Sequence, residues 1–285
     1  MKLTQIYKGE EIVLGIVTEQ GIVDVAAEAE RREVAAPDTM LEAIEGGENA
    51  LNVLAKLADG AQCFAENAPA PVVTGGEKIL CIGLNYRQHA KECNLPLPPA
   101  PVLFNKFSNA LAADGDSIYL DPAYREYDYE AELVAVIGKP ARNVSEEDAL
   151  NYVFGYTCGN DLSTRDLQFA RSNQWLLSKT FDGFAPIGPC VVTADSICPN
   201  DLAISSVVNG ELRQNSRTSD MIFSTAQIIA DLSRHFTLQP GDLIFTGTPQ
   251  GVMHGYPADK KNWLKPGDTV SVTIEGIGTI TNTFR

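Results

Sequence analysis

The chain has 285 residues, of which 44 % are hydrophobic and 21 % are charged, and this composition excludes a disordered chain. Its formal charge of −15 makes nucleic acids and acidic membrane surfaces poor partners. No apolar run reaches the ~18 residues of a membrane span, and the N-terminus lacks the apolar stretch of a secretory signal. The sequence therefore predicts a cytoplasmic protein without a membrane or nucleic-acid partner.

The N-terminal part differs in pattern from the rest. Residues 1–25 alternate apolar and polar side chains around glycines, which predicts a meander of short strands. Residues 24–59 are rich in Ala, Glu and Leu at helical spacing. Residues 68–76 hold two prolines and a Gly pair, which predicts an exposed, extended linker. We therefore expect a small N-terminal domain, 1–75, and a main domain, 76–285.

The main domain is predicted to be mainly β. Pro-Gly pairs in Leu238–Asp242 and Leu264–Asp268 are typical of type II turns that lead into strands. Ser145–Asp148 resembles a capping box that opens a helix toward Tyr152, and apolar residues over 228–236 predict an amphipathic helix. Because strands outnumber helices without alternating with them, a doubly wound sheet is disfavoured. The predicted strands are Ile79–Gly83, Glu132–Ile137, Gly188–Val192, Leu243–Phe245 and Thr269–Ile274.

Two glutamates begin the most informative strand. Glu130 and Glu132 lie on one face, about 7 Å apart along the strand, and two buried carboxylates need a cation between them. Asp161 follows a second strand and supplies a third carboxylate. Three hard oxygen ligands suit Mg²⁺ or Mn²⁺. The alternatives are that the glutamates are solvated at an exposed strand start and that Asp161 caps a helix.

Cysteine and histidine offer few further candidates. The six cysteines are scattered without a C-x-x-C motif or a Cys/His cluster, which favours small buried side chains over structural zinc. Of the three histidines, His235 at a helix end and His254 in a loop are interpreted as structural. His89 has Glu92 three residues later, so one helical turn brings them together as a general base. The alternative is an ordinary surface contact.

Two further segments complete the candidate site. Asn94–Pro101 holds four prolines, cannot be helical and would suit a hinged cover over the base. Lys179 stands within an apolar and aromatic stretch. Its ammonium either reaches the solvent along its own stem or points into a pocket that holds an anionic substrate.

Together these motifs resemble the fumarylacetoacetate hydrolase family over about Ile79 to Ile274. The resemblance implies an α+β fold, mainly β: a mixed β-sandwich roll with a small N-terminal α+β domain, usually in a homodimer. The matching motifs, in the family's order, are Gly83-Leu-Asn-Tyr with His89 and Glu92, Tyr129-Glu-Ala-Glu-Leu, Gly159-Asn-Asp161, Arg165-Asp-Leu-Gln168, Ser178-Lys-Thr and Gly247-Thr-Pro-Gln-Gly-Val.

The resemblance also implies roles for these residues. Glu130, Glu132 and Asp161 would hold the divalent metal. Lys179 would act at the carboxylate of a 2-oxo acid substrate, and His89 with Glu92 would form a catalytic dyad on a lid. The other substrate contacts implied are Arg165, Gln168, Gly247 and Thr248.

The expected reaction is metal-dependent hydrolysis of a C–C bond in an acylpyruvate or related 2,4-dioxo acid. Pyruvate would leave as an enolate stabilised by the metal and the lysine. Two alternatives use the same enolate: decarboxylation of oxaloacetate, and isomerisation of an unsaturated 2-oxo dioic acid. A third alternative is a metal-holding binding protein without turnover. The sequence leaves the acyl tail of the substrate open.

Overall fold

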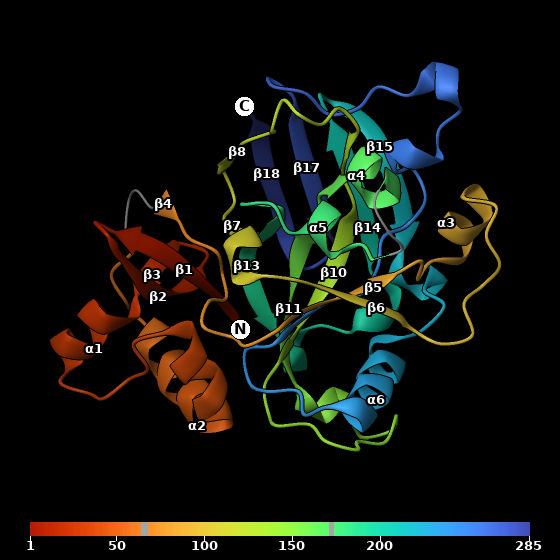
Figure 1. The fold of residues 1–285 in the computed structure, drawn as a ribbon. Helices are drawn as coiled ribbons and strands as arrows, with labels where there is room; N and C mark the ends of the chain where they lie inside the picture. Colours follow the sequence, from red (N-terminus) through yellow and green to blue (C-terminus); the bar gives the residue numbers. More distant parts are fainter. Residues whose placement is uncertain (64–67, 171–173) are drawn as a thin grey trace.

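The computed structural model describes residues 1–63, 68–170 and 174–285, and two packed sheets dominate it (Figure 1). The larger sheet has the order β3-β2-β1-β13-β11-β10-β16-β5-β6, with β4 beside β1 and β7 beside β13. Its strands are β1 (Lys2–Lys8), β2 (Glu11–Thr18), β3 (Gly21–Asp24), β4 (Ala68–Pro69), β5 (Ile79–Gly83), β6 (Val102–Lys106), β7 (Leu111–Ala112), β10 (Ala131–Ile137), β11 (Val153–Asn160), β13 (Ala185–Thr193) and β16 (Leu243–Phe245).

The second sheet has the order β15-β14-β17-β18-β8 and packs against the centre of the first. In both sheets most pairs are antiparallel, while β16–β5, β13–β7 and β18–β8 are parallel. The fold is therefore α+β and mainly β, as predicted. The remaining strands are β8 (Ser117–Ile118), β14 (Ala203–Val208), β15 (Glu211–Arg217), β17 (Thr269–Ile274), β18 (Gly278–Phe284) and the separate pair β9 (Tyr127–Asp128) and β12 (Ser163–Thr164).

The helices lie around the sheets and do not alternate regularly with the strands along the chain, and α1 and α2 lie beside β1–β3 (Figure 1). No helix within the described ranges has the length and apolar character needed to cross a membrane. The α-helices are α1 (Val25–Arg32), α2 (Met40–Ala58), α3 (Arg87–Glu92), α4 (Arg165–Ala170), α5 (Leu176–Lys179) and α6 (Thr225–His235). The 3₁₀ helices are η1 (Ser108–Ala110), η2 (Ala149–Tyr152), η3 (Ala194–Ser196), η4 (Pro199–Asp201), η5 (Thr218–Asp220), η6 (Met253–Gly255) and η7 (Ala258–Lys260).

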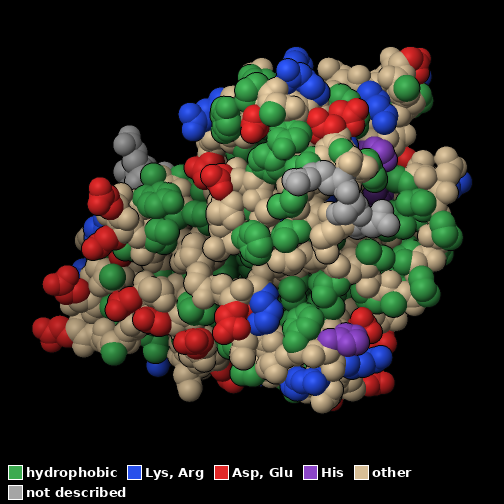
Figure 2. Space-filling model, in the orientation of Figure 1, with side chains coloured by type: hydrophobic (Ala, Val, Ile, Leu, Met, Phe, Trp, Pro, Cys, Tyr) green, Lys and Arg blue, Asp and Glu red, His purple; other side chains and the backbone are tan. Residues whose placement is uncertain are grey.

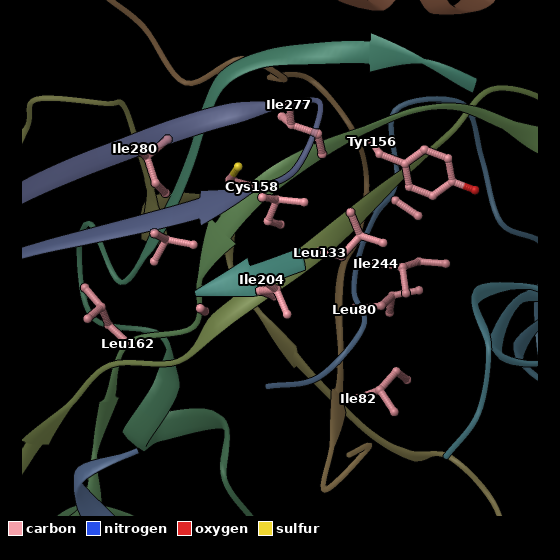
Figure 3. Close-up of a cluster of buried hydrophobic side chains, with 14 of the residues drawn as sticks. Leu80, Ile82, Leu133, Tyr156, Cys158, Leu162, Ile204, Ile244, Ile277 and Ile280 are labelled. Carbon is pink, nitrogen blue, oxygen red and sulfur yellow. The ribbon is translucent and has the colours of Figure 1, made fainter. Parts of the chain in front are cut away.

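The main core fills the space between the two sheets. Figure 3 shows Leu133 of β10 facing Ile204 of β14, with Ile280 of β18 in the same cluster. Each of these side chains is buried, and burying an aliphatic side chain of this size stabilises the fold by about 1.5–3 kcal/mol. This packing fixes β10 and β11, the two strands from which the predicted carboxylates arise.

The predicted elements are confirmed in most places. All five predicted strands are present, and the two Pro-Gly turns place Gly241 and Gly267 at φ 84° and 93°, as a type II turn requires. The predicted capping box is only partly correct. Ser145 does accept the backbone N–H of Asp148 at 3.2 Å, but the segment forms a turn and then η2. Because β11 begins at Val153, no room remains for an α-helix.

The prediction of an exposed linker at residues 68–76 is only partly correct, since Ala68, Pro69 and Gly75 are exposed but 70–73 are buried. Ala68–Pro69 pairs with β1, and Val72 and Val73 are each only 1 % exposed. The predicted extended backbone is present, but the two valines pack into a core cluster shared with Leu54 and Ile187. In addition, β1 pairs with β13, so the N-terminal strands continue the large sheet. The two-domain division at residue 75 remains a prediction.

Acidic side chains cover the N-terminal helices, where Glu30, Glu45 and Glu48 are exposed (Figure 2). Glu28 differs because it is buried and accepts bonds from Arg31 at 2.5 Å and Arg32 at 2.6 Å. The bond from Arg31 outweighs burial and, with Arg32, lowers the pKa of Glu28 to about 2.

Glu28→Gln is therefore expected to lower the free energy of unfolding by about 1 kcal/mol at neutral pH, since both arginines are partly exposed. A carboxyl group whose pKa is lowered by folding stabilises the folded protein at pH values above its pKa in the unfolded chain. This stabilisation disappears as the pH falls from 4.5 toward 2. Urea unfolding of the wild-type protein and of Glu28→Gln across this pH range measures the loss of stabilisation. A difference between them that stays constant with pH would contradict the prediction.

Candidate active site

Three buried carboxylates meet at the ends of two paired strands. Glu130 precedes β10, Glu132 is its second residue, and Asp161 directly follows β11. The antiparallel pairing sets Glu132 opposite Gly159, and one ligand oxygen of each carboxylate lies within 4.8 Å of the others. The predicted cluster therefore forms. Because Glu130 and Glu132 are 5 % and 2 % exposed, the alternative of a solvated strand start is wrong.

Gly159 allows the strands to pack tightly at this point. A Cβ at Gly159 would lie 2.5 Å from both the Phe245 ring and a methyl group of Val134. No real side chain tolerates such a contact. The glycine therefore lets these two side chains pack directly beneath the strand that leads to Asp161.

Two cations hold the carboxylates in place. Lys179 donates to Glu130 at 2.6 Å and to Asp161 at 2.9 Å, so its ammonium is buried in the site and does not reach the solvent. Arg165 binds Asp128 at 2.9 Å and also binds Glu130. The Asp161 side chain is thus engaged by lysine and caps none of the helices in the described part of the chain.

A third cation, Lys106, was missed by sequence reasoning. Its Nζ lies 2.6 Å from Asp161 and donates to the carbonyl oxygens of Leu162 at 3.1 Å, Lys179 at 2.5 Å and Phe184 at 2.7 Å. The ammonium is thus enclosed by oxygen atoms. The residues around Lys106 do not indicate that it pairs with Asp161, because β6 lies far from Asp161 in the sequence.

When Asp128 is included, four carboxylates face three cations, Lys106, Arg165 and Lys179, so one negative charge is left in excess. Burial raises the pKa of Glu130, yet Lys179 and Arg165 outweigh it and lower this pKa to about 2. Glu132 forms no ion pair with any described residue, and burial, Asp161 and Glu130 raise its pKa well above the usual value. A buried carboxylate crowded by like charges and aimed at two others fits a divalent cation with hard oxygen ligands.

The loop after β16 supports this cluster. Gly247 donates its backbone N–H to Glu132 at 2.7 Å, and Thr248 donates its hydroxyl to the carbonyl of Ala131 at 3.0 Å. Gln214, which sequence reasoning missed, donates to Thr248 at 2.8 Å from the second sheet. These bonds position the loop and Glu132. Direct substrate contacts of Gly247 and Thr248 remain predictions.

The predicted dyad is present on α3. His89 is buried and its Nδ1 lies 3.1 Å from a carboxylate oxygen of Glu92. Glu92 also accepts the backbone N–H of Gly251 at 3.0 and 3.2 Å, so the helix is tied to the loop after β16. Burial lowers the pKa of His89, but bonds with Cys93 and Glu92 raise it to about 9. The imidazole is therefore protonated at neutral pH.

One pocket of about 470 Å³ brings these groups together. It is lined by the three carboxylates, by His89 and Lys179, and by Arg165, Gln168 and Thr248. A large part of its wall is apolar and is formed by Ile82, Leu95, Val102, Phe104, Phe169 and Trp175. The segment 94–101, predicted as a cover, is non-helical and contributes Leu95.

His254 was interpreted as structural, and this is wrong in part. It lines the same pocket and stacks on Phe169 with 5.1 Å between ring centroids. Burial and the charge of Arg165 lower its pKa, so the imidazole is neutral at neutral pH. Its place in η6, after the Gly247–Gly251 loop, was the signal that could have located it.

The comparison with protein families agrees with this geometry. The family model described as fumarylacetoacetate (FAA) hydrolase C-terminal matches residues 78–285. The chain belongs to the fumarylacetoacetate hydrolase family. This confirms the resemblance and places every predicted site residue within the matched part.

Three similar proteins illustrate the range of the family. The Xenopus laevis protein named oxaloacetate tautomerase fahd2, mitochondrial, is 43 % identical over 86 % of this chain and 78 % of its own. The structure of a fumarylacetoacetate hydrolase from Exiguobacterium antarcticum has a TM-score of 0.86, 33 % identity, and coverage of 100 % and 99 % of the two chains. That of maleylpyruvate hydrolase from Sphingobium sp. SYK-6, in complex with manganese(II) and pyruvate, has a TM-score of 0.81, 30 % identity, and coverage of 100 % and 98 %.

Proposed function

We propose that this protein is a divalent-metal-dependent tautomerase that interconverts the enol and keto forms of oxaloacetate. The observation that carries the proposal is the contact of His89 with Glu92, which stabilises a protonated imidazole, while His89 lines the pocket that also holds the carboxylate cluster. A proton donor beside a site for a chelating 2-oxo acid is what this reaction needs. The name of the Xenopus laevis relative supports the choice of substrate.

The cation is proposed to be Mg²⁺ or Mn²⁺, held by Glu130, Glu132 and Asp161. The manganese-containing relative supports a metal of this class. When bound, such a cation supplies Lewis-acid polarisation of a 2-oxo acid. Lys179 and Arg165 fix Glu130, while Gly247 fixes Glu132.

His89 is proposed to carry the proton. In the direction from enol to keto, the imidazolium donates its proton to carbon 3 of the substrate, and the electron pair of the C=C bond forms the new C–H bond. The enol hydroxyl loses its proton to solvent as the C=O bond forms, and solvent then reprotonates the imidazole. Glu92 stabilises the charged form and orients the ring.

His89→Ala is expected to reduce tautomerisation by about 10²-fold or more, the usual effect of removing a positioned acid or base. The decay of enol absorbance after oxaloacetate is dissolved measures the rate. Gln88→Ala is the matched control, since this exposed residue lies beside His89 on the same helix. Unchanged activity in the His89 variant would refute the proposed role.

Hydrolysis of acylpyruvates is a second candidate because the apolar wall of the pocket exceeds what oxaloacetate requires. Pyruvate release from acetylpyruvate, measured with Mg²⁺ and again with EDTA, tests it. Decarboxylation of oxaloacetate is separated from hydrolysis by His89→Ala, because loss of CO₂ needs no activated water. The homodimer and the cytoplasmic location remain predictions.

A further inference from the structure

A second group of potential metal ligands lies on α3 and the residue that follows it, apart from the three carboxylates. The ligand atoms of His89, Glu92 and Cys93 lie within 4.8 Å of one another. Nδ1 of His89 is 3.1 Å from Glu92 and 3.9 Å from Sγ of Cys93. This arrangement corrects the expectation that the chain holds no Cys/His cluster.

The chemistry of this group differs from that of the carboxylate cluster. Imidazole, thiolate and carboxylate are the ligands that Zn²⁺ prefers, with three protein ligands and one open position in sites that are not purely structural. Tetrahedral bonds of zinc length place nitrogen and oxygen ~3.4 Å apart, and nitrogen and sulfur ~3.6 Å apart. The observed separations of 3.1 and 3.9 Å lie close to these values.

The helical backbone already holds the three side chains together. His89, Glu92 and Cys93 stand at positions i, i+3 and i+4 on α3 and its C-cap, Cys93, which keeps helical dihedral angles, and side chains at this spacing are neighbours. The backbone N–H of Cys93 donates to the carbonyl of His89 at 3.0 Å, so the last turn is closed. Only small side-chain movements separate this arrangement from a tridentate site.

We propose that His89, Glu92 and Cys93 form an inhibitory zinc site at the edge of the pocket. Binding releases the thiol proton of Cys93 and the Nδ1 proton of the imidazolium to solvent. A zinc ion on Nδ1 leaves the remaining ring proton on Nε2, and the imidazole then has no free lone pair with which to exchange protons. Binding is independent of the proposed function, whereas inhibition rests on it.

Cobalt(II) is the probe that separates this site from the carboxylate cluster, because only thiolate ligation gives a sulfur-to-cobalt charge-transfer band. With the carboxylate cluster saturated with Mg²⁺, one equivalent of Co²⁺ is expected to produce the band in the full-length protein. Cys93→Ser should abolish it. Cys198→Ser, which changes an exposed cysteine, should keep it. Absence of the band, or its survival in Cys93→Ser, would overturn the proposal.

Inhibition provides a second readout. Zn²⁺ at saturating Mg²⁺ is expected to inhibit oxaloacetate tautomerisation, and the concentration for half inhibition should rise at least tenfold in Cys93→Ser. Equal sensitivity of both proteins would place inhibition at the carboxylate cluster and refute the regulatory role. If the protein has no tautomerase activity, the proposed function fails, while the cobalt band still decides the metal site.

Discussion

Replacing Glu132 by glutamine is expected to abolish metal-dependent turnover and at the same time to stabilise the metal-free protein. Loss of one of the three proposed carboxylate ligands should reduce activity by about 10³-fold or more, since a catalytic cation of this kind contributes several kcal/mol. The pKa of Glu132 is higher in the folded protein than in the unfolded chain. Its ionised form therefore destabilises the fold at neutral pH.

The neutral side chain keeps the local structure. The amide oxygen of a glutamine can still accept the N–H of Gly247, which Glu132 accepts at 2.7 Å. We therefore expect the free energy of unfolding without metal to rise by about 1–2 kcal/mol, the usual gain when a strained functional group is removed. Calorimetric Mn²⁺ titration, turnover and urea unfolding in EDTA measure the three effects.

Glu77→Gln is the matched control because Glu77 is exposed and pairs only with Lys78 among the contacts described. It should leave Mn²⁺ affinity and turnover unchanged. Full Mn²⁺ binding by the Glu132 variant would show that the cation lies elsewhere. A lower free energy of unfolding for this variant would contradict the expectation that ionised Glu132 destabilises the metal-free fold.

Lys106→Met is expected to lower the free energy of unfolding by about 3–5 kcal/mol, the usual cost of breaking a buried ion pair by removing one partner. The methionine has a similar volume but no donor for Asp161 or for the carbonyl oxygens that Lys106 now satisfies. Among the described residues, Asp161 then keeps only Lys179 as a cationic partner. Metal-free protein is the right sample, because a bound cation would mask part of the loss.

Urea unfolding in EDTA measures this effect, with Lys265→Met as the control. Lys265 pairs with Asp268 at 3.1 Å, but its side chain is largely exposed, so its removal should cost less than about 1 kcal/mol. Similar losses in the two variants would show that the Lys106 ammonium is not the buried anchor described above.

The carboxylate cluster was predictable because its signal is local. Glu130 and Glu132 share a strand face by simple alternation, and buried carboxylates without a cation are costly. Lys106 and Gln214 could not be found in the same way. Each reaches the site from a strand whose position depends on sheet order rather than on neighbouring residues.

Two other errors have physical causes. Prolines in residues 68–76 predicted extended backbone correctly, but extension does not determine exposure, and Val72 and Val73 supplied enough apolar surface to be buried. The scattered cysteines predicted isolated thiols and no Cys/His cluster, because no two cysteines form a C-x-x-C motif. Cys93 follows His89 by four residues, which is one helical turn, and this spacing was visible in the sequence.

The proline-rich segment 94–101 also affects behaviour at high protein concentration. It leads into β6, which ends the strand order of the large sheet and carries the exposed Leu103. An open apolar edge strand is a template for pairing with other chains. Proline lacks the N–H that such pairing needs, so the edge cannot lengthen toward residue 94. The same segment that borders the pocket thus limits edge-to-edge aggregation.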